Sequence, residues 1–274
     1  MKLIFSCTAL VFIYFLSMSC VNAADRHSAS ELYVKSGLEK QMRDIGPALL
    51  AGYKNNYSRS DQHTDRDKKI YGNIEQVIED SFDVEGMREK VVVGLMEGIS
   101  DGDMELILAW LDSPVGKKIT GLEERAGSEE GVRETMEYIK NIKKASISPE
   151  RIRRVKDLNS SMNITDTTVD IALSTQFALT MTTKKAKKNI SRDDVRGLYE
   201  DFQKNRERLE PMLRNQVHGS LLYTYQELSD EDLGQYLAFA QSESGKKYNS
   251  VTTSILLKAI AESSLQFAWE ISQL

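Results

Sequence analysis

The sequence predicts an all-α fold, and three observations point to it. The 274 residues contain only four prolines and sixteen glycines, so long stretches lack residues that break helices. Apolar residues recur at helical spacing, as in the series Ile70, Ile74, Val77 and Ile78, which lies on one face of an amphipathic helix. No segment alternates apolar and polar residues as a half-buried strand does, and no Asn-Gly or Asp-Gly turn joins two such segments. We therefore expect a helical bundle.

The N-terminal segment 1–23 has the layout of a secretory signal peptide. Lys2 precedes an almost wholly apolar run over residues 3–18, and small residues lead up to Ala23. One alternative is an uncleaved transmembrane anchor, because the apolar run is nearly long enough to span a bilayer. Another is lipid attachment at Cys20, although a serine stands where a lipoprotein signal normally has leucine. The small residues before the polar Asp25 favour cleavage after Ala23, so we expect an exported, periplasmic protein.

Cysteine content and charge exclude some classes of protein. Both cysteines, Cys7 and Cys20, lie in the signal segment, so the mature chain has no disulfide and folds on its hydrophobic core alone. Without Lys2 it carries 35 basic and 41 acidic residues, a net charge of −6. A mildly acidic chain lacks the positive surface that nucleic-acid binding requires. No second long apolar run follows, so we expect the mature chain not to span a membrane.

Capping residues indicate where helices begin along the chain. A serine or threonine hydroxyl accepts a hydrogen bond from an amide of the first turn, and acidic residues there face the positive end of the helix dipole. Proline in the first helical position loses no hydrogen bond. The polar segment 53–69 is instead expected to form a loop. The predicted helix starts follow Ser100, Ser113, Ser148, Thr165, Ser191 and Ser229.

One stretch of the sequence occurs twice, at an offset of 129 in the numbering. "ISDGDMELILAWLDSPVGKKI" (99–119, the first motif) aligns without a gap on "LSDEDLGQYLAFAQSESGKKY" (228–248, the second motif). Nine of the 21 positions are identical, where about one or two are expected by chance. We interpret the motifs as parts of a duplicated helical unit. The boundary is expected near "ASISP" (145–149), which gives a signal segment 1–23, a first repeat 24–147 and a second repeat 148–274.

The motif residues have structural roles in this prediction. A serine begins each of two consecutive helices, and an apolar group ending in a large aromatic residue fills the buried face of the first helix. A glycine one turn into the second helix costs about 1 kcal/mol relative to alanine, so we expect a close approach of helix backbones there. The residues concerned are Ser100, Leu108, Ala109, Trp110, Ser113, Pro114 and Gly116 in the first motif, and Ser229, Leu237, Ala238, Phe239, Ser242 and Gly245 in the second.

At these residues the sequence resembles a bacterial family, that of domain of unknown function 2059. The family core looks like a serine-started helix, an "L-x-x-L-x-x-F-Y" stripe and then "S-P-x-G-K-K". The aromatic pair is replaced by Trp110-Leu111 in the first motif and by Phe239-Ala240 in the second, which also has Glu243 in place of the proline. The resemblance covers roughly forty residues per copy, and the second copy is the more degenerate. It implies an all-helical, exported protein and no established activity.

Residues that commonly carry catalysis are sparse. The histidines His27, His63 and His218 are far apart, and none has a second histidine four residues away, so no metal site or cofactor is expected. No "G-x-S-x-G" motif is present, and the mature chain has no cysteine nucleophile. Acidic pairs such as Glu129-Glu130 lie at helix starts, where they compensate the helix dipole. We therefore expect a protein that is not an enzyme.

The candidate binding residues are two lysine pairs, Lys117-Lys118 and Lys246-Lys247, which follow the motif glycines. An alternative is that they only keep the surface soluble. The apolar C-terminal segment 255–274 is expected to form a helix that closes the core. The alternative is a helix that lies on a membrane surface, although only Lys258 in it is basic. Self-association through this helix is a further option.

The function expected from these observations is a non-catalytic interaction or ligand-binding module of the bacterial periplasm. It would present a groove between helices to an unknown protein partner or small ligand. The alternative is a hydrolase of cell-envelope material whose carboxylate site forms only on folding. Two facing, buried carboxylates in a pocket would favour the hydrolase, whereas an apolar groove would favour the binding protein.

Overall fold

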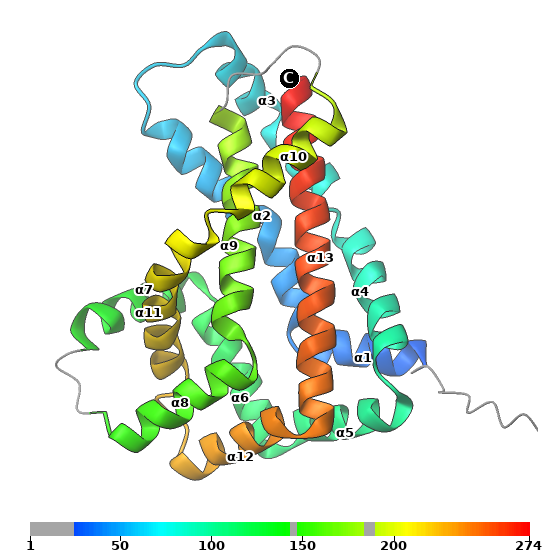
Figure 1. The fold of residues 1–274 in the computed structure, drawn as a ribbon, viewed down its shortest axis with the longest axis vertical. Coiled ribbons are helices and arrows are strands. Elements are labelled where there is room, and N and C mark those ends of the chain that lie inside the picture. The colour runs from blue at the N-terminus through cyan, green and yellow to red at the C-terminus, as the bar shows by residue number, and fades with distance from the viewer. Residues whose placement is uncertain (1–24, 143–146, 184–189) are drawn as a thin grey trace, which may run out of the picture.

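The computed structural model describes residues 25–142, 147–183 and 190–274, and every regular element in these ranges is a helix (Figure 1). The all-α prediction is therefore confirmed for this part of the chain. The signal segment with Cys7 and Cys20, and part of the expected boundary at 145–149, lie outside the described residues. The helices are α1 (Arg26–Lys35), α2 (Leu38–Ser58), α3 (Asp65–Ser81), α4 (Val84–Gly98), α5 (Asp101–Asp112), α6 (Pro114–Ala126), α7 (Glu129–Asn141), α8 (Pro149–Ser161), α9 (Ile164–Thr183), α10 (Arg192–Gln203), α11 (Arg206–Thr224), α12 (Asp230–Gln241) and α13 (Glu243–Gln273).

Serine side chains cap most of the predicted helix starts. In each case the hydroxyl accepts a hydrogen bond from the amide three residues later, which satisfies a donor that has no partner inside the helix. Ser128, which is not among the predicted caps, also caps a helix: its hydroxyl accepts from the amide of Gly131 at the start of α7 at 3.1 Å. Helix α9 begins at Ile164, one residue before the predicted cap. The predicted caps that are confirmed are Ser100, Ser113, Ser148, Ser191 and Ser229.

The prediction of a loop over residues 53–69 is wrong for most of that segment. Only residues 59–64 connect α2 to α3. Tyr53 is 5% exposed, and the ring of Tyr57 stacks on that of His63 with centroids 3.7 Å apart. The two tyrosines are four residues apart and extend the buried face of α2, a periodicity hidden by the polar residues between them.

The buried faces of α5 and α12, the first helix of each motif, also differ from the prediction. In α5, Ala109 is exposed and Trp110 is half-buried, and in α12 Ala238 is exposed. Three consecutive residues span about 200° of a helix, so they cannot all face the core. The residues that are buried follow helical spacing instead: Met104, Ile107 and Leu111 in α5, and Leu233, Tyr236 and Ala240 in α12.

The long C-terminal helix α13 passes through the middle of the molecule (Figure 1). It packs against α3, α4 and α5 as well as α9, and Phe267 and Ile271 on it are fully buried. Helix α4 comes close because it carries glycine at the contact: a Cβ on Gly98 would lie 2.6 Å from Cγ1 of Val251. The helix closes the core as expected. Since its apolar face is occupied within the monomer, self-association through it stays a prediction.

The hydrophobic core crosses the expected boundary between the repeats. Helix α13 belongs to the second repeat but packs into one cluster with α1 to α5. Helix α6 belongs to the first repeat but packs with α8, α11 and α12, and α7 lies against α11. Each repeat therefore lends its last helices to the core of the other. Among the described helices, none is both long and apolar enough to cross a membrane.

Candidate functional site

Each motif forms a tight corner between two consecutive helices. In the first motif, Ser113 Oγ donates a hydrogen bond to the carbonyl oxygen of Trp110 at 2.6 Å and accepts one from the amide of Gly116 at 2.9 Å. Pro114 occupies the first position of α6. A Cβ on Gly116 would lie 2.1 Å from the Trp110 carbonyl oxygen, so the corner accepts only glycine. The expected close approach of backbones is confirmed here.

The second motif forms the same corner. Ser242 Oγ donates to the carbonyl of Phe239 at 2.7 Å and accepts from the amide of Gly245 at 3.0 Å. A Cβ on Gly245 would lie 1.9 Å from the Phe239 carbonyl oxygen. A third corner, between α6 and α7, uses Ser128 and Gly131 in the same way. It was missed because it lacks the lysine pair that made the other two recognisable.

The two motif corners pack against each other through reciprocal contacts. The rings of Trp110 and Phe239, which align with each other in the repeat, are stacked with centroids 4.6 Å apart and planes 10° apart. Asp232 at the start of α12 accepts from Lys118 on α6 at 2.9 Å. Asp103, its counterpart on α5, accepts from Ser244 on α13 at 2.7 Å. Each motif thus contacts the other through the same ring and the same acid, although the two acids accept from residues at different positions of the motifs.

The candidate lysines lie on the outside of this contact. All four are exposed. Lys118 pairs with Asp232, whose pKa is lowered chiefly by that hydrogen bond. Lys117 lies 3.4 Å from Asp112. Lys247 contributes, after the hydrogen bonds from serines, to lowering the pKa of Asp103. None of the four lysines lines the cavity or the pocket described next.

A cavity of about 170 Å³, the inner cavity, lies where the two motifs meet. Twelve of its lining residues form six pairs at the repeat offset of 129, of which four pairs lie within the motifs and two lie just after them. The pairs are Trp110 and Phe239, Leu111 and Ala240, Gly116 and Gly245, Ile119 and Tyr248, Thr120 and Asn249, and Glu123 and Thr252.

A larger pocket of about 470 Å³, the outer pocket, adjoins the inner cavity between α2, α6 and α9. The two spaces share part of their wall, including Thr120 and Glu123. The outer pocket is lined mainly by apolar groups, such as Leu49 and Ile171. A cavity of roughly 150 Å³ already accommodates a molecule the size of benzene, so the two spaces together suit a small organic ligand.

Glu123 is the one described residue of the shared wall that carries a carboxyl group. The residue as a whole is half-buried, but its carboxyl group is surrounded by protein atoms. Its Oε1 accepts hydrogen bonds from the hydroxyls of Tyr225 at 2.7 Å and Tyr236 at 3.0 Å. Burial raises the pKa of this carboxyl, and the two tyrosine hydrogen bonds oppose that shift. Burial also holds the pKa of both tyrosines well above the usual range, so they remain donors. Within the described chain, no basic side chain acts on this carboxyl.

An arginine of α8 fixes the turn that carries Tyr225. Arg151 donates from Nη2 to the carbonyl oxygens of Tyr225 and, at 2.9 Å, of Leu228, and from Nη1 to Oδ1 of Asp230 at 2.8 Å. These carbonyls follow the end of α11 and have no partner inside a helix, although the Tyr225 carbonyl also accepts from the amide of Leu228 at 3.0 Å. The guanidinium therefore contacts several acceptors of the turn at once. Arg151 therefore positions Tyr225 against Glu123 without touching the cavity itself.

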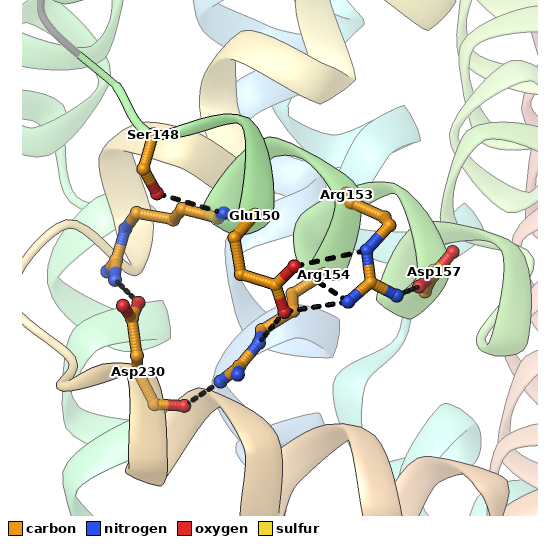
Figure 2. Close-up of polar contacts among 7 residues, drawn as sticks. Ser148, Glu150, Arg153, Arg154, Asp157 and Asp230 are labelled. Atoms are coloured by element: carbon orange, nitrogen blue, oxygen red, sulfur yellow. Dashed lines mark hydrogen bonds and ion pairs between the residues drawn. The ribbon is translucent and has the colours of Figure 1, made fainter.

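A second set of arginine contacts supports the same turn (Figure 2). Arg154 donates to the backbone carbonyl of Asp230 and to Glu150 at 2.9 Å. Arg153 points along α8 instead, where it pairs with Glu150 at 2.7 Å and Asp157 at 3.5 Å. Arg154 thus joins α8 to α12, whereas Arg153 makes contacts within one helix only.

Sequence reasoning missed Glu123 and its two tyrosines. In "GLEER" the glutamate looks like one of several solvent-facing acids, and the tyrosines are 102 and 113 residues away. A signal was nevertheless present, because the offset between the motifs aligns Glu123 with the neutral Thr252. Among the described residues, no group of three histidine, cysteine or acidic side chains could hold a metal ion.

Comparisons with protein-family models, curated proteins and solved structures give no match to this chain. The resemblance to domain of unknown function 2059 therefore stays a prediction, and the candidate site rests on the geometry of this molecule.

Proposed function

We propose that this chain is an exported, non-catalytic protein of the bacterial periplasm that binds a small ligand in the outer pocket and inner cavity. The observation that carries this proposal is an apolar pocket that leads to one hydrogen-bonded carboxyl, Glu123. Ligand sites typically combine a mostly apolar lining with a few polar groups that orient the ligand. Export is supported by the signal-like segment 1–23 of the sequence.

A hydrolase is supported less well by the same pocket. Glycoside hydrolysis needs two carboxyl groups that flank the scissile bond, one of them kept protonated by its environment. The other carboxylates that line the outer pocket, Asp44 and Glu124, are exposed, and Asp44 pairs with Lys40 at 3.1 Å. One buried carboxyl suits recognition of a ligand better than hydrolysis.

The sequence repeat has a role in this proposal. We infer that the two motifs descend from one duplicated unit and that their meeting creates the inner cavity. The six lining pairs and the reciprocal contacts of Asp103 and Asp232 support this inference. In this proposal the lysine pairs form ion pairs and keep the outer surface of the corners polar, and they do not bind the ligand.

The proposal is tested by native mass spectrometry of mature protein released gently from bacterial periplasm. We expect a discrete additional mass from a small bound molecule. Ala48→Trp should abolish it, because Ala48 lines the outer pocket and an indole there fills it. Ala51→Trp is the matched control, since Ala51 is exposed on the same helix and lines no part of the pocket. A bare protein mass, or a ligand retained in Ala48→Trp, would contradict the proposal.

A further inference from the structure

Aromatic side chains line much of the inner cavity. Trp110 and Phe239 form a stacked pair on its wall. Tyr236 lies 6.3 Å from Trp110 and Tyr248 lies 6.5 Å from Phe239, measured between ring centroids. Trp, Tyr and Phe rings attract cations through their quadrupoles, and groups of such rings are the usual recognition elements for quaternary ammonium ligands.

The same cavity is acidic in its lining. Among the described residues that line it, Glu123 is the only carboxyl, and none is a lysine, arginine or histidine. A buried carboxylate without a countercharge is unfavourable, because neither water nor an opposite charge compensates its desolvation. Both tyrosine hydroxyls donate to Oε1, which leaves Oε2 for a group that enters the cavity.

The helix corner itself does not require this acid. The second motif builds the same serine–glycine corner with Thr252 at the position of Glu123. The position of Tyr248 is Ile119 in the first motif. Since one copy forms the corner without the acid and the other without this tyrosine, the two side chains are additions to the shared scaffold. Both face the same cavity.

We propose that the site takes an organic cation: an alkylammonium or quaternary ammonium head beside Glu123 in the inner cavity, with an apolar tail in the outer pocket. This inference rests on the proposed ligand-binding function. It adds the chemical class of the ligand, which the charge and the aromatic lining of the cavity define.

The test is isothermal titration of the mature protein with three ligands that share an eight-carbon tail: octyltrimethylammonium, octanol and octanoate. We expect the ammonium to bind about tenfold more tightly than octanol, and octanoate to bind most weakly. Glu123→Gln keeps the size and the acceptor oxygen of the side chain. It should reduce the affinity for the ammonium to that for octanol and leave the affinity for octanol unchanged. Glu105→Gln, an exposed acid on α5 outside the pocket lining, is the matched charge control.

The ammonium affinity should also depend on pH. Because the pKa of Glu123 is raised, the affinity increases as pH rises and the carboxyl ionises, and Glu123→Gln removes this dependence. The other titratable groups around the Glu123 carboxyl are Tyr225, Tyr236 and Tyr248. Their pKa values are raised, so they keep their protons over the pH range in which Glu123 ionises. Glu124 follows it on α6, and Lys40 pairs with Asp44 on α2.

The outcomes separate the two proposals. Equal affinities for all three ligands, or an unchanged ammonium preference in Glu123→Gln, would overturn the proposal that the ligand is a cation. The proposal that the pocket binds a small ligand would remain. Binding of none of the three ligands would overturn both.

Discussion

The two motifs fold into the same corner but differ in what they place inside it. Both use a serine, a glycine and an aromatic ring in the same geometry. They differ where they face the inner cavity, with Ile119 against Tyr248, and one turn beyond the motifs with Glu123 against Thr252. The second helix also differs: residues 114–141 are divided into α6 and α7, whereas the corresponding residues of α13 are continuous. The shared residues therefore form the scaffold, and the differences carry the specific chemistry.

The largest effect is expected where the motifs are identical. Gly116→Ala and Gly245→Ala should each destabilise the protein by about 3 kcal/mol, because the added Cβ would lie 2.1 or 1.9 Å from a backbone carbonyl oxygen. Equilibrium unfolding in urea measures the change. Gly102→Ala is the control: nothing lies within 4 Å of its Cβ position, so stability should stay the same or rise by up to about 1 kcal/mol. Equal effects at all three glycines would refute the shared corner.

The turns that lead into the two motifs also differ. Arginines of α8 donate hydrogen bonds to the α11–α12 turn, which leads into the second motif. Arg151→Ala should destabilise the protein by about 2 kcal/mol, since it leaves the acceptors of the α11–α12 turn without their charged donor. Arg153→Ala should change stability by less than about 0.5 kcal/mol, because its ion pairs are exposed and lie within α8. Thermal unfolding compares the two variants. A similar loss in both would show that the network in Figure 2 acts only as surface charge.

The buried acid that follows the first motif makes stability depend on pH. Since the folded pKa of Glu123 is raised above its ordinary 4.5, its contribution to stability is fully present below pH 4.5 and is lost as pH rises through the folded pKa. Glu123→Gln should therefore match the wild type in acid and exceed its stability at higher pH, because the amide stays neutral where the buried carboxyl ionises. Urea unfolding across this range measures the difference, with Glu105→Gln as control. A constant difference at every pH would contradict the buried, ionising carboxyl.

The smallest effect is expected for the coupling between the motifs. In a double-mutant cycle, Trp110→Leu and Phe239→Leu should show a coupling free energy of about 1 kcal/mol, the usual value for a stacked aromatic pair. Strictly additive effects would mean that the rings merely fill space next to each other.

The parts of this fold that could be predicted from the sequence are local. Ser100, Ser113 and Ser229 cap their helices through residues three positions away, so a short pattern contains the whole interaction. Tyr53 was misassigned because its burial depends on the packing of α2, which the polar residues around it conceal. Glu123 could not be found in the same way. Its hydrogen-bond partners come from α12 and the end of α11, and only the folded chain brings them together.

The central claim is that a ligand enters the cavity between the motifs, and tryptophan fluorescence tests it directly. The chain has two tryptophans: Trp110 lines the inner cavity, and Trp269 lies under Arg192, 3.9 Å from its guanidinium. In Trp269→Phe, titration with octyltrimethylammonium should change the Trp110 emission in a saturable manner. Trp110→Phe, which keeps only Trp269, should show no such change. A response that follows Trp269, or none from Trp110, would contradict the account.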